Sequence, residues 1–228
     1  TSAIDYVTSD DLPKLYLLTG HGEVELSSSF QSAVADQNVE TESLSLLSAE
    51  AVPEDADAAL IYAPQSDLAA EEVEMLQTYL QAGGNLILIT DPPLEGSLTN
   101  LEGLMAGYGV TAAEGIVVEG SQSHYALGTP YYLLPTISYH DITSPLTENG
   151  YYVLLPIAQG LTVSAELPDG VSVTELLTTS DSAYSKVDGY SLTTYEKEVG
   201  DLDGPFALAV AITDEVDEDT ESKLVWVS

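Results

Sequence analysis

A strand, a helix and a second strand follow one another between residues 58 and 92, and this pattern constrains the fold more than any other feature. Residues 58–64 (AALIYAP) form a short apolar run that ends in proline, and residues 85–93 (NLILITDPP) form a second run of this kind. Because parallel strands need a long crossover, the helix between them predicts a parallel α/β sheet. The apolar stripe of this helix comprises Leu68, Val73, Leu76 and Leu80.

The ends of this helix carry their own signals. Ser66 or Asp67 is expected to cap its first turn, and the glutamates at 71–72 suit the positive N-terminal end of a helix. The glycines at 83–84 are expected to end it, since glycine accepts the left-handed conformation of a C-terminal cap.

The same alternation continues on both sides of this unit. It predicts a doubly wound, flavodoxin-like or Rossmann-like α/β fold over residues 14–120, with a mostly parallel sheet and helices on both faces. The further expected strands are residues 14–19, 39–47 and 115–119, and the further expected helices are residues 24–37 and 98–108.

Beyond residue 120 the composition changes. Residues 120–150 are rich in Ser, Gly, Pro and Tyr without any period, which predicts a long irregular excursion over the sheet. Residues 151–228 are expected to extend the same sheet, partly antiparallel, with a hairpin around the polar tip at 214–222. With residues 1–13 as a polar lead-in, residues 14–228 are expected to form a single domain. The expected strands of the extension are residues 151–155, 161–165, 171–178, 205–213 and 223–227.

The charge of the chain limits its partners. Four Lys+Arg stand against 38 Asp+Glu, a formal net charge of −34. Such a surface repels phosphates, so we expect no nucleic-acid partner. It favours cations, basic partners or simple solubility, and adaptation to high salt would also select it. The absence of cysteine excludes thiol catalysis, disulfides and Cys-based zinc sites.

The two ends of the chain indicate an excised piece. The sequence does not begin with Met, shows no signal peptide, and has no apolar run near the ~20 residues of a membrane span. We therefore expect an extracytoplasmic domain cut from a longer, membrane-anchored protein, with anchors on either side.

The turn Gly20-His21-Gly22-Glu23 follows the first strand and is the first candidate site. Backbone N–H groups at such a strand–turn–helix junction can bind anions. However, the dinucleotide pattern lacks its third glycine, the P-loop pattern is absent, and the acidic side chains would repel a phosphate. Three interpretations of the turn remain: a structural tight turn, a site for another ligand, or a site for a partner.

Parallel strands place their carboxyl ends at one edge, where ligands sit in open α/β sheets. Residues 19–23, 63–65 and 91–93 are therefore expected to line one rim. Asp91 on this rim would bind a cation, accept a hydrogen bond or cap the following segment.

The other candidate residues are His124 and His140, which lie in irregular segments and could approach His21. A zinc or iron site is one interpretation, but their spacing fits no metal motif and structural histidines are the default. No G-x-S-x-G elbow occurs. We expect no catalytic residues, no metal and no cofactor.

A resemblance rests on residues 15–23 (LYLLTGHGE), 57–92 and 100–110 (NLEGLMAGYGV), with weaker likeness at 139–146, 175–180 and 204–213. These segments resemble the auxiliary domain of bacterial ABC transport systems, the family that includes the gliding-motility ABC transporter auxiliary proteins. The turn from Gly20 to Glu23 and the acid Asp91 match family positions. The resemblance implies a flavodoxin-like or amidotransferase-like α/β fold without catalytic equipment, outside the membrane, beside an ABC permease and ATPase.

The leading hypothesis is therefore a non-catalytic extracytoplasmic accessory domain of a bacterial ABC transport system, partnered by its permease and ATPase. One alternative is a hydrolytic or metal-dependent enzyme that uses His21, Glu23 and Asp91 on the rim. Another is a solute receptor with its pocket under residues 120–150.

Overall fold

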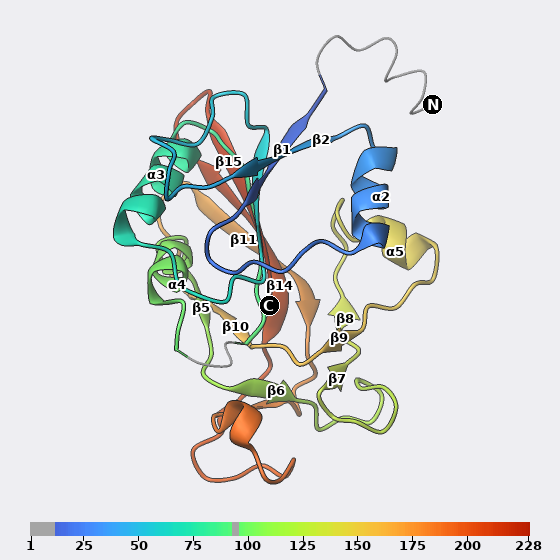
Figure 1. The fold of residues 1–228 in the computed structure, drawn as a ribbon. Helices are drawn as coiled ribbons and strands as arrows, with labels where there is room; N and C mark the ends of the chain where they lie inside the picture. The colour runs from blue at the N-terminus through green and yellow to red at the C-terminus, as the bar shows by residue number, and fades with distance from the viewer. Residues whose placement is uncertain (1–11, 93–95) are drawn as a thin grey trace.

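A large mixed sheet organises the molecule (Figure 1). The computed structural model describes residues 12–92 and 96–228, so the predicted lead-in lies outside the described residues up to residue 11, as does Pro93 of the predicted rim. The sheet has ten strands, parallel in one half and antiparallel in the other. The prediction of an α/β fold with a large, partly antiparallel sheet is confirmed.

The parallel half has the strand order β2-β1-β3-β4-β15. Its first four members are the strands expected from the sequence, because each apolar run is bounded by turn residues. The strands are β1 (Lys14–Leu18), β2 (Glu40–Leu44), β3 (Ala58–Tyr62), β4 (Leu86–Ile89) and β15 (Glu221–Val227).

The antiparallel half continues from β15 through the predicted hairpin. β14 pairs with β15, β10 and β11, while β5 and β8 close the outer positions. These strands are β5 (Val110–Ala112), β8 (Thr136–Ile137), β10 (Leu161–Val163), β11 (Val171–Thr178) and β14 (Ala207–Glu215).

The strand expected at residues 115–119 forms, but it does not belong to the large sheet. This segment forms β6, which pairs with β12 in a separate three-stranded sheet, and β15 lies beside β4 instead. β15 fits there because Leu224 and Trp226 bury one face while Val225 and Val227 cover the other. The smaller sheets consist of β6 (Ile116–Val118), β12 (Tyr184–Lys186) and β13 (Leu202–Asp203), and of β7 (Tyr132–Leu133) and β9 (Leu155–Pro156).

Helices α3 and α4 cover one face of the sheet (Figure 1). Leu76 and Leu80 of α3 and Leu101 of α4 are buried against Ile61 and Trp226, which project from the sheet. This apolar cluster is the main core. The helices are α2 (Ser28–Asp36), α3 (Ala70–Gln81), α4 (Thr99–Ala106), α5 (Ser144–Glu148) and the 3-10 turn η1 (Gly189–Ser191).

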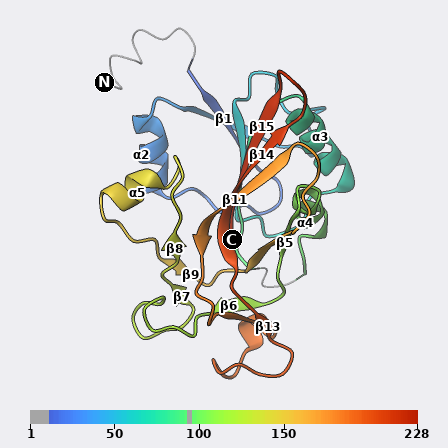
Figure 2. The same ribbon diagram turned by 180° about the vertical axis from the view of Figure 1, so that it is seen from behind.

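The opposite face is covered differently. Val225 and Val227 point to this face and pack with Val117 of β6 and Leu133 of β7, in a second apolar cluster. Helix α2 also lies on this side, near α5, but none of its residues is buried (Figure 2). Helices therefore lie on both faces as expected, but only α3 and α4, on one face, bury residues in the main core, and α2 on the other face buries none.

The predicted cap of α3 is also corrected. Neither Ser66 nor Asp67 caps this helix; Glu72 accepts a hydrogen bond from Ala69 N at 2.9 Å. Asp67 instead accepts the N–H groups of Asn100 and Leu101 at 2.7 and 3.2 Å. A loop residue can cap whichever helix start its carboxylate reaches, and here that helix is α4.

Within residues 12–92 and 96–228, no helix has the length and apolar character that a membrane span requires.

Candidate functional site

The turn after β1 ties two strand ends together. The carbonyl oxygen of His21 accepts hydrogen bonds from Gln65 N at 2.9 Å and Ser66 N at 3.0 Å, which belong to the loop after β3. Gly20 and Gly22 have φ values of +126° and +76°. A Cβ at Gly20 would stand 2.9 Å from a methyl group of the exposed Leu47, which can move aside, so the backbone conformation is what favours glycine there.

This turn directs the His21 side chain inward, between two carboxylates. His21 Nε2 lies 2.9 Å from Glu72 Oε2, and His21 Nδ1 lies 3.4 Å from Glu23 Oε1. The exposed fractions of the three side chains are 6%, 4% and 7%. Each ring nitrogen thus faces an acid, and both can donate only when both carry a proton. We call His21, Glu23 and Glu72 the histidine cluster.

The histidine cluster is incompletely bonded. His21 Nδ1, Glu23 Oε1 and Glu72 Oε1 are buried atoms without a hydrogen bond. The histidine cluster contains two carboxyl groups but only one basic side chain, that of His21. No lysine of the chain compensates, because all are paired elsewhere. The pairs are Lys14–Asp55, Lys186–Asp201, Lys197–Asp203 and Lys223–Glu221.

Sequence reasoning placed His21 and Glu23 together but missed Glu72. Its position in the first turn of α3 suggested only an interaction with the helix dipole. The helix start faces the turn after β1, so Glu72 both caps Ala69 and contacts His21. Only the parallel packing of β1 beside β3 brings these residues together.

The end of β3 shows backbone strain. Ala63 is buried and has a φ of +47°, in the left-handed region that a side chain rarely adopts. In α/β hydrolases a strained turn at a strand end holds the nucleophile. Alanine offers no reacting group at this position.

A cavity of about 300 Å³ lies at the predicted rim, where β3 and β4 end. Gln65, Ser66 and Asp91 line it, with Tyr190 from the loop between β12 and β13. The Tyr190 hydroxyl donates to the Pro92 carbonyl at 3.2 Å. Partial burial, and then the nearby Asp91, raise the pKa of Tyr190. Asp91 is exposed on this rim, whereas His21 is buried beneath it.

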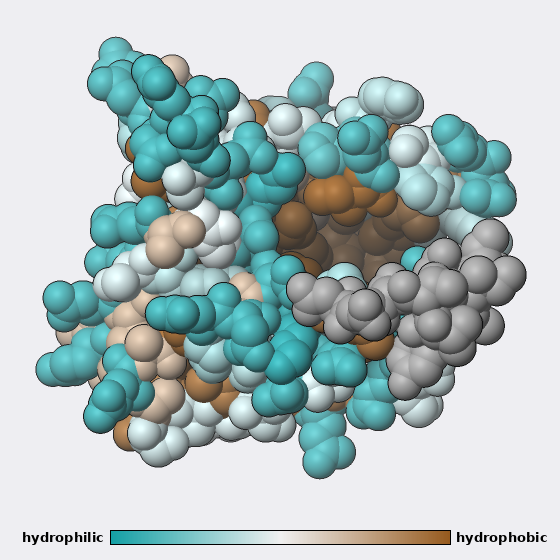
Figure 3. Space-filling model, turned by 90° about the horizontal axis from the view of Figure 1, so that it is seen from above, coloured by the Kyte–Doolittle hydropathy of each residue, from teal (hydrophilic) through white to brown (hydrophobic). Residues whose placement is uncertain are grey.

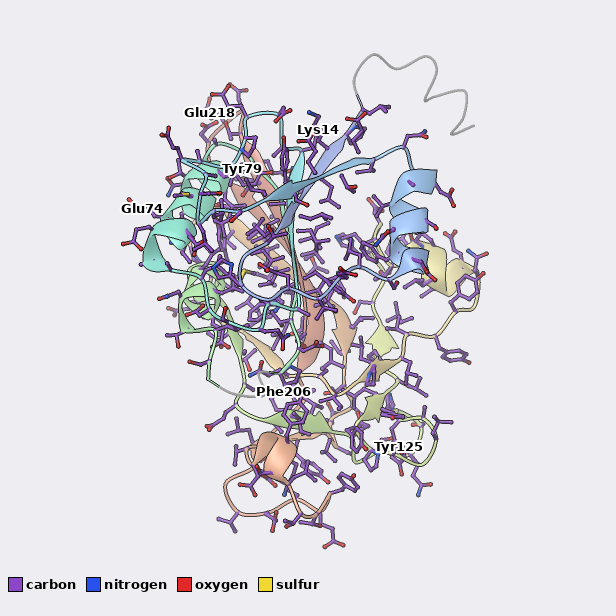
Figure 4. All side chains as sticks on the ribbon, in the orientation of Figure 1. Lys14, Glu74, Tyr79, Tyr125, Phe206 and Glu218 are labelled. Atoms are coloured by element: carbon purple, nitrogen blue, oxygen red, sulfur yellow. The ribbon has the colours of Figure 1, made fainter. Side chains whose placement is uncertain are left out.

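The other two histidines bond within their own segments. His124 Nδ1 lies 3.0 Å from Ser123 Oγ, and His140 Nδ1 accepts from Ile142 N at 3.1 Å. Tyr125, next to His124, lies at the end of the molecule opposite to Glu218 (Figure 4). Among the described residues, no hydrogen bond or ion pair joins either histidine to the turn. In the same residues, no group of three or more His, Asp or Glu could hold a metal ion.

A larger groove of about 580 Å³ separates α2 from the sheet. Leu17, Leu60 and Tyr62 of the sheet form one wall, and Val34 of α2 lies on the other. Seen from above, the molecule is hollowed and the surface inside the hollow is hydrophobic (Figure 3). Glu23 of the histidine cluster is among the residues that line the groove. We call this space the α2 groove.

Comparisons of structure extend this description. The mmIFT52 N-terminal domain has a TM-score of 0.62 and 14% identity over 94% of this chain and 85% of that one. A putative thua-like protein from Bacteroides uniformis has a TM-score of 0.47 and 10% identity over 96% of this chain and 82% of that one. At these identities only the first likeness carries weight, and it concerns the fold alone.

Comparisons of sequence identify the family. No curated protein matches the chain. The family model described as "ABC-type uncharacterized transport system" matches residues 12–223, nearly the whole described chain. The match includes the turn after β1, the β3–α3–β4 unit and the antiparallel strands. The chain therefore belongs to the auxiliary family of ABC-type transport systems.

Proposed function

We propose that this chain is a non-catalytic accessory domain that works by binding, on the extracytoplasmic side of an ABC transport system. Its partners are the permease and ATPase of the same system. Family membership supplies the transport role, and the binding mode, the side of the membrane and the lack of catalysis are our proposal.

One observation carries the binding role. Large apolar side chains are exposed on both sides of α5, although the chain as a whole is strongly acidic. Exposed apolar patches on soluble domains mark interaction sites, and tyrosine is enriched in such interfaces. We call these residues the α5 patch: Tyr139 (82% exposed), Ile142 (50%), Tyr151 (63%), Tyr152 (85%) and Leu154 (47%).

The histidine cluster supports a role without catalysis. A general base must reach a substrate proton, and an exposed imidazole is the usual choice. His21 is buried with a carboxylate beside each ring nitrogen, and Ala63 occupies the strained strand end. The order β2-β1-β3-β4 further supports a flavodoxin-like arrangement, a fold that hosts binding as readily as chemistry.

Site-specific crosslinking tests the partner. A photoreactive benzoylphenylalanine at Tyr152 should crosslink to the permease in cells that express the whole transport system. The same group at Glu218, on the exposed hairpin tip, is the matched control and should not. Absence of any crosslink to a transporter subunit from Tyr152, in protein that reaches the membrane fraction, would contradict the proposal.

The 228 residues of this chain contain no cysteine, so a cysteine introduced here is the single thiol of the domain and can test its location. A Glu218→Cys variant of the full-length protein should react with a membrane-impermeant maleimide in intact cells as completely as in lysed cells. Labelling only after lysis would place the domain in the cytoplasm and contradict the extracytoplasmic proposal, while leaving the crosslinking result interpretable.

A further inference from the structure

The α2 groove exists because α2 does not pack down onto the sheet. No residue of α2 is buried; its apolar side chains Phe30 and Val34 are half-buried, and Val34 lines the groove. The Phe30 ring stands 6.3 Å from that of Tyr62, at the end of β3. A helix normally buries its apolar face against the sheet that it covers. Here part of that face borders open space.

The size and the walls of the groove suit a small organic ligand. Its volume of about 580 Å³ falls within the usual range of small-molecule sites. Leu17, Leu26, Val34 and Tyr62 supply apolar surface. The polar side chains of the lining are Thr19, Glu23, Glu25, Gln31, Thr41 and Ser43. A ligand with an apolar body would bury this surface and gain the hydrophobic contribution that α2 leaves unused.

The charged residues that line the groove are all acidic. Glu23 and Glu25 line it, and no lysine or arginine does. The sequence contains neither residue type between residues 15 and 185, so no flexible loop of that region can supply one. Glu23 is buried: its Oε2 accepts a hydrogen bond from His21 N at 2.8 Å, whereas its Oε1 has no hydrogen bond. A buried carboxylate oxygen without a hydrogen bond favours a further donor.

We propose that the α2 groove is a binding site for a small organic ammonium compound with an apolar body. The apolar body lies between α2 and the sheet, against Leu17, Val34 and Tyr62. The ammonium group lies beside Glu23 and Glu25 and donates to the Glu23 carboxylate oxygen that has no hydrogen bond. This site goes beyond the proposed accessory role and does not depend on it.

The probe for the test is n-octylammonium chloride, used below its micelle concentration and titrated calorimetrically into the chain. 1-Octanol and sodium octanoate have the same apolar body with no charge or the opposite charge. We expect octylammonium to bind at one site, octanol to bind at least about tenfold more weakly, and octanoate not to bind. Equal binding of all compounds, or binding of none, would overturn the proposal.

Two matched pairs of variants locate the site. Glu23→Gln should weaken octylammonium binding about tenfold, whereas Glu50→Gln, an equal charge change at an exposed residue outside the groove, should not. Ala35→Trp should fill the groove and abolish binding, whereas Ala33→Trp, on the same helix but outside the lining, should not. The tryptophan pair keeps the test valid if Glu23→Gln fails to fold.

Other occupants would give different results. If Glu23→Gln and Glu50→Gln weakened octylammonium binding equally, the ammonium compound would be attracted to the acidic surface as a whole. That result would overturn the proposed site. Octylammonium binding that appears only after deletion of residues 1–11 would make that segment the natural occupant and overturn the proposal. Concentration-dependent dimerisation abolished by Ala35→Trp would identify a second copy as the occupant, with the same consequence.

Discussion

Lys186 is buried completely, whereas Lys14, Lys197 and Lys223 are between 27% and 66% exposed. Its ammonium group donates to Asp201 Oδ2 at 2.8 Å and to Glu198 Oε2 at 2.5 Å, and so fastens the loop between β12 and β13. Burial works against the charged ammonium, but these carboxylates outweigh it and raise the pKa of Lys186. Burial likewise opposes the Asp201 carboxylate, yet its hydrogen bond from Lys186 lowers the pKa of Asp201.

Replacement of Lys186 by methionine should lower the melting temperature and expose the loop 187–203 to protease. Because the pKa of Asp201 is lowered, the ion pair contributes fully above the ordinary carboxyl value of 3.8 and is lost as the pH falls further. The difference in melting temperature between wild type and Lys186→Met should therefore narrow below that pH. Lys223→Met, at an exposed pair, is the control and should change little.

Thr90 holds the indole of Trp226 in the core. Trp226 Nε1 donates to Thr90 Oγ1 at 3.0 Å, and both residues are buried. Thr90→Val should lower the free energy of unfolding by about 1–3 kcal/mol, since a buried N–H loses its acceptor. Thr90→Ser keeps the oxygen and should lose less. Fluorescence of Trp226, the single tryptophan, during urea unfolding measures both values.

Helices α4 and α2 differ in how strongly their loss would affect the stability of the whole molecule. α4 buries Leu101, Leu104 and Met105 in the main core, whereas α2 buries none of its residues. Loss of a helix cap should therefore be felt throughout the molecule at α4 and only locally at α2.

Asp67→Ala removes the acceptor for two N–H groups at the start of α4. We expect a decrease of about 1–2 kcal/mol in the global free energy of unfolding. Chemical denaturation measures it. Asp67→Asn retains one acceptor oxygen, so its free energy of unfolding should lie between those of the wild type and Asp67→Ala. An Asn variant as unstable as the Ala variant would contradict a capping role.

Ser27→Ala removes the cap of α2, where Ser27 Oγ accepts from Phe30 N at 3.2 Å. Helix formation should weaken by about 1 kcal/mol, but the melting temperature of the whole chain should barely change. Hydrogen exchange of the α2 amides should accelerate several-fold, with no change in α4. Ser29→Ala, inside the same helix, is the control.

For the whole molecule, the excess of acidic residues is a source of self-repulsion. A net charge of −34 on 228 residues opposes the compact state, and salt screens that repulsion. The same excess leaves the histidine cluster without a lysine neighbour.

The melting temperature should therefore rise by several degrees as NaCl increases from about 10 mM to about 0.5 M. Calorimetry at neutral pH measures this rise. Near the isoelectric point of about 4.1 the net charge approaches zero and the rise should disappear. An equal rise at both pH values would point to a general salting effect instead of charge screening.

The β3–α3–β4 unit and the β14–β15 hairpin could be predicted because their signals are local: apolar runs of fixed length, glycine stops and a polar tip. The rim at the ends of β3 and β4 followed from the parallel connection. Glu72 and the α2 groove could not be predicted. Both depend on how far a helix lies from a strand that is remote in sequence.

The sequence by itself determined the β3–α3–β4 unit, the β14–β15 hairpin, the α/β class, the acidity and the family, since each is set by composition or by spacing between near neighbours. The strand expected at residues 151–155 does not form as such, because β9 begins only at Leu155, and the segment expected to be irregular, residues 120–150, contains β7, β8 and α5. The tertiary structure alone decided which strand lies beside β4, because β6 and β15 are both apolar enough to be buried. It also decided that His21 is buried between Glu23 and Glu72 and that His124 and His140 lie apart from it. These outcomes depend on three-dimensional packing, where desolvation and charge act between residues that the chain order keeps far apart.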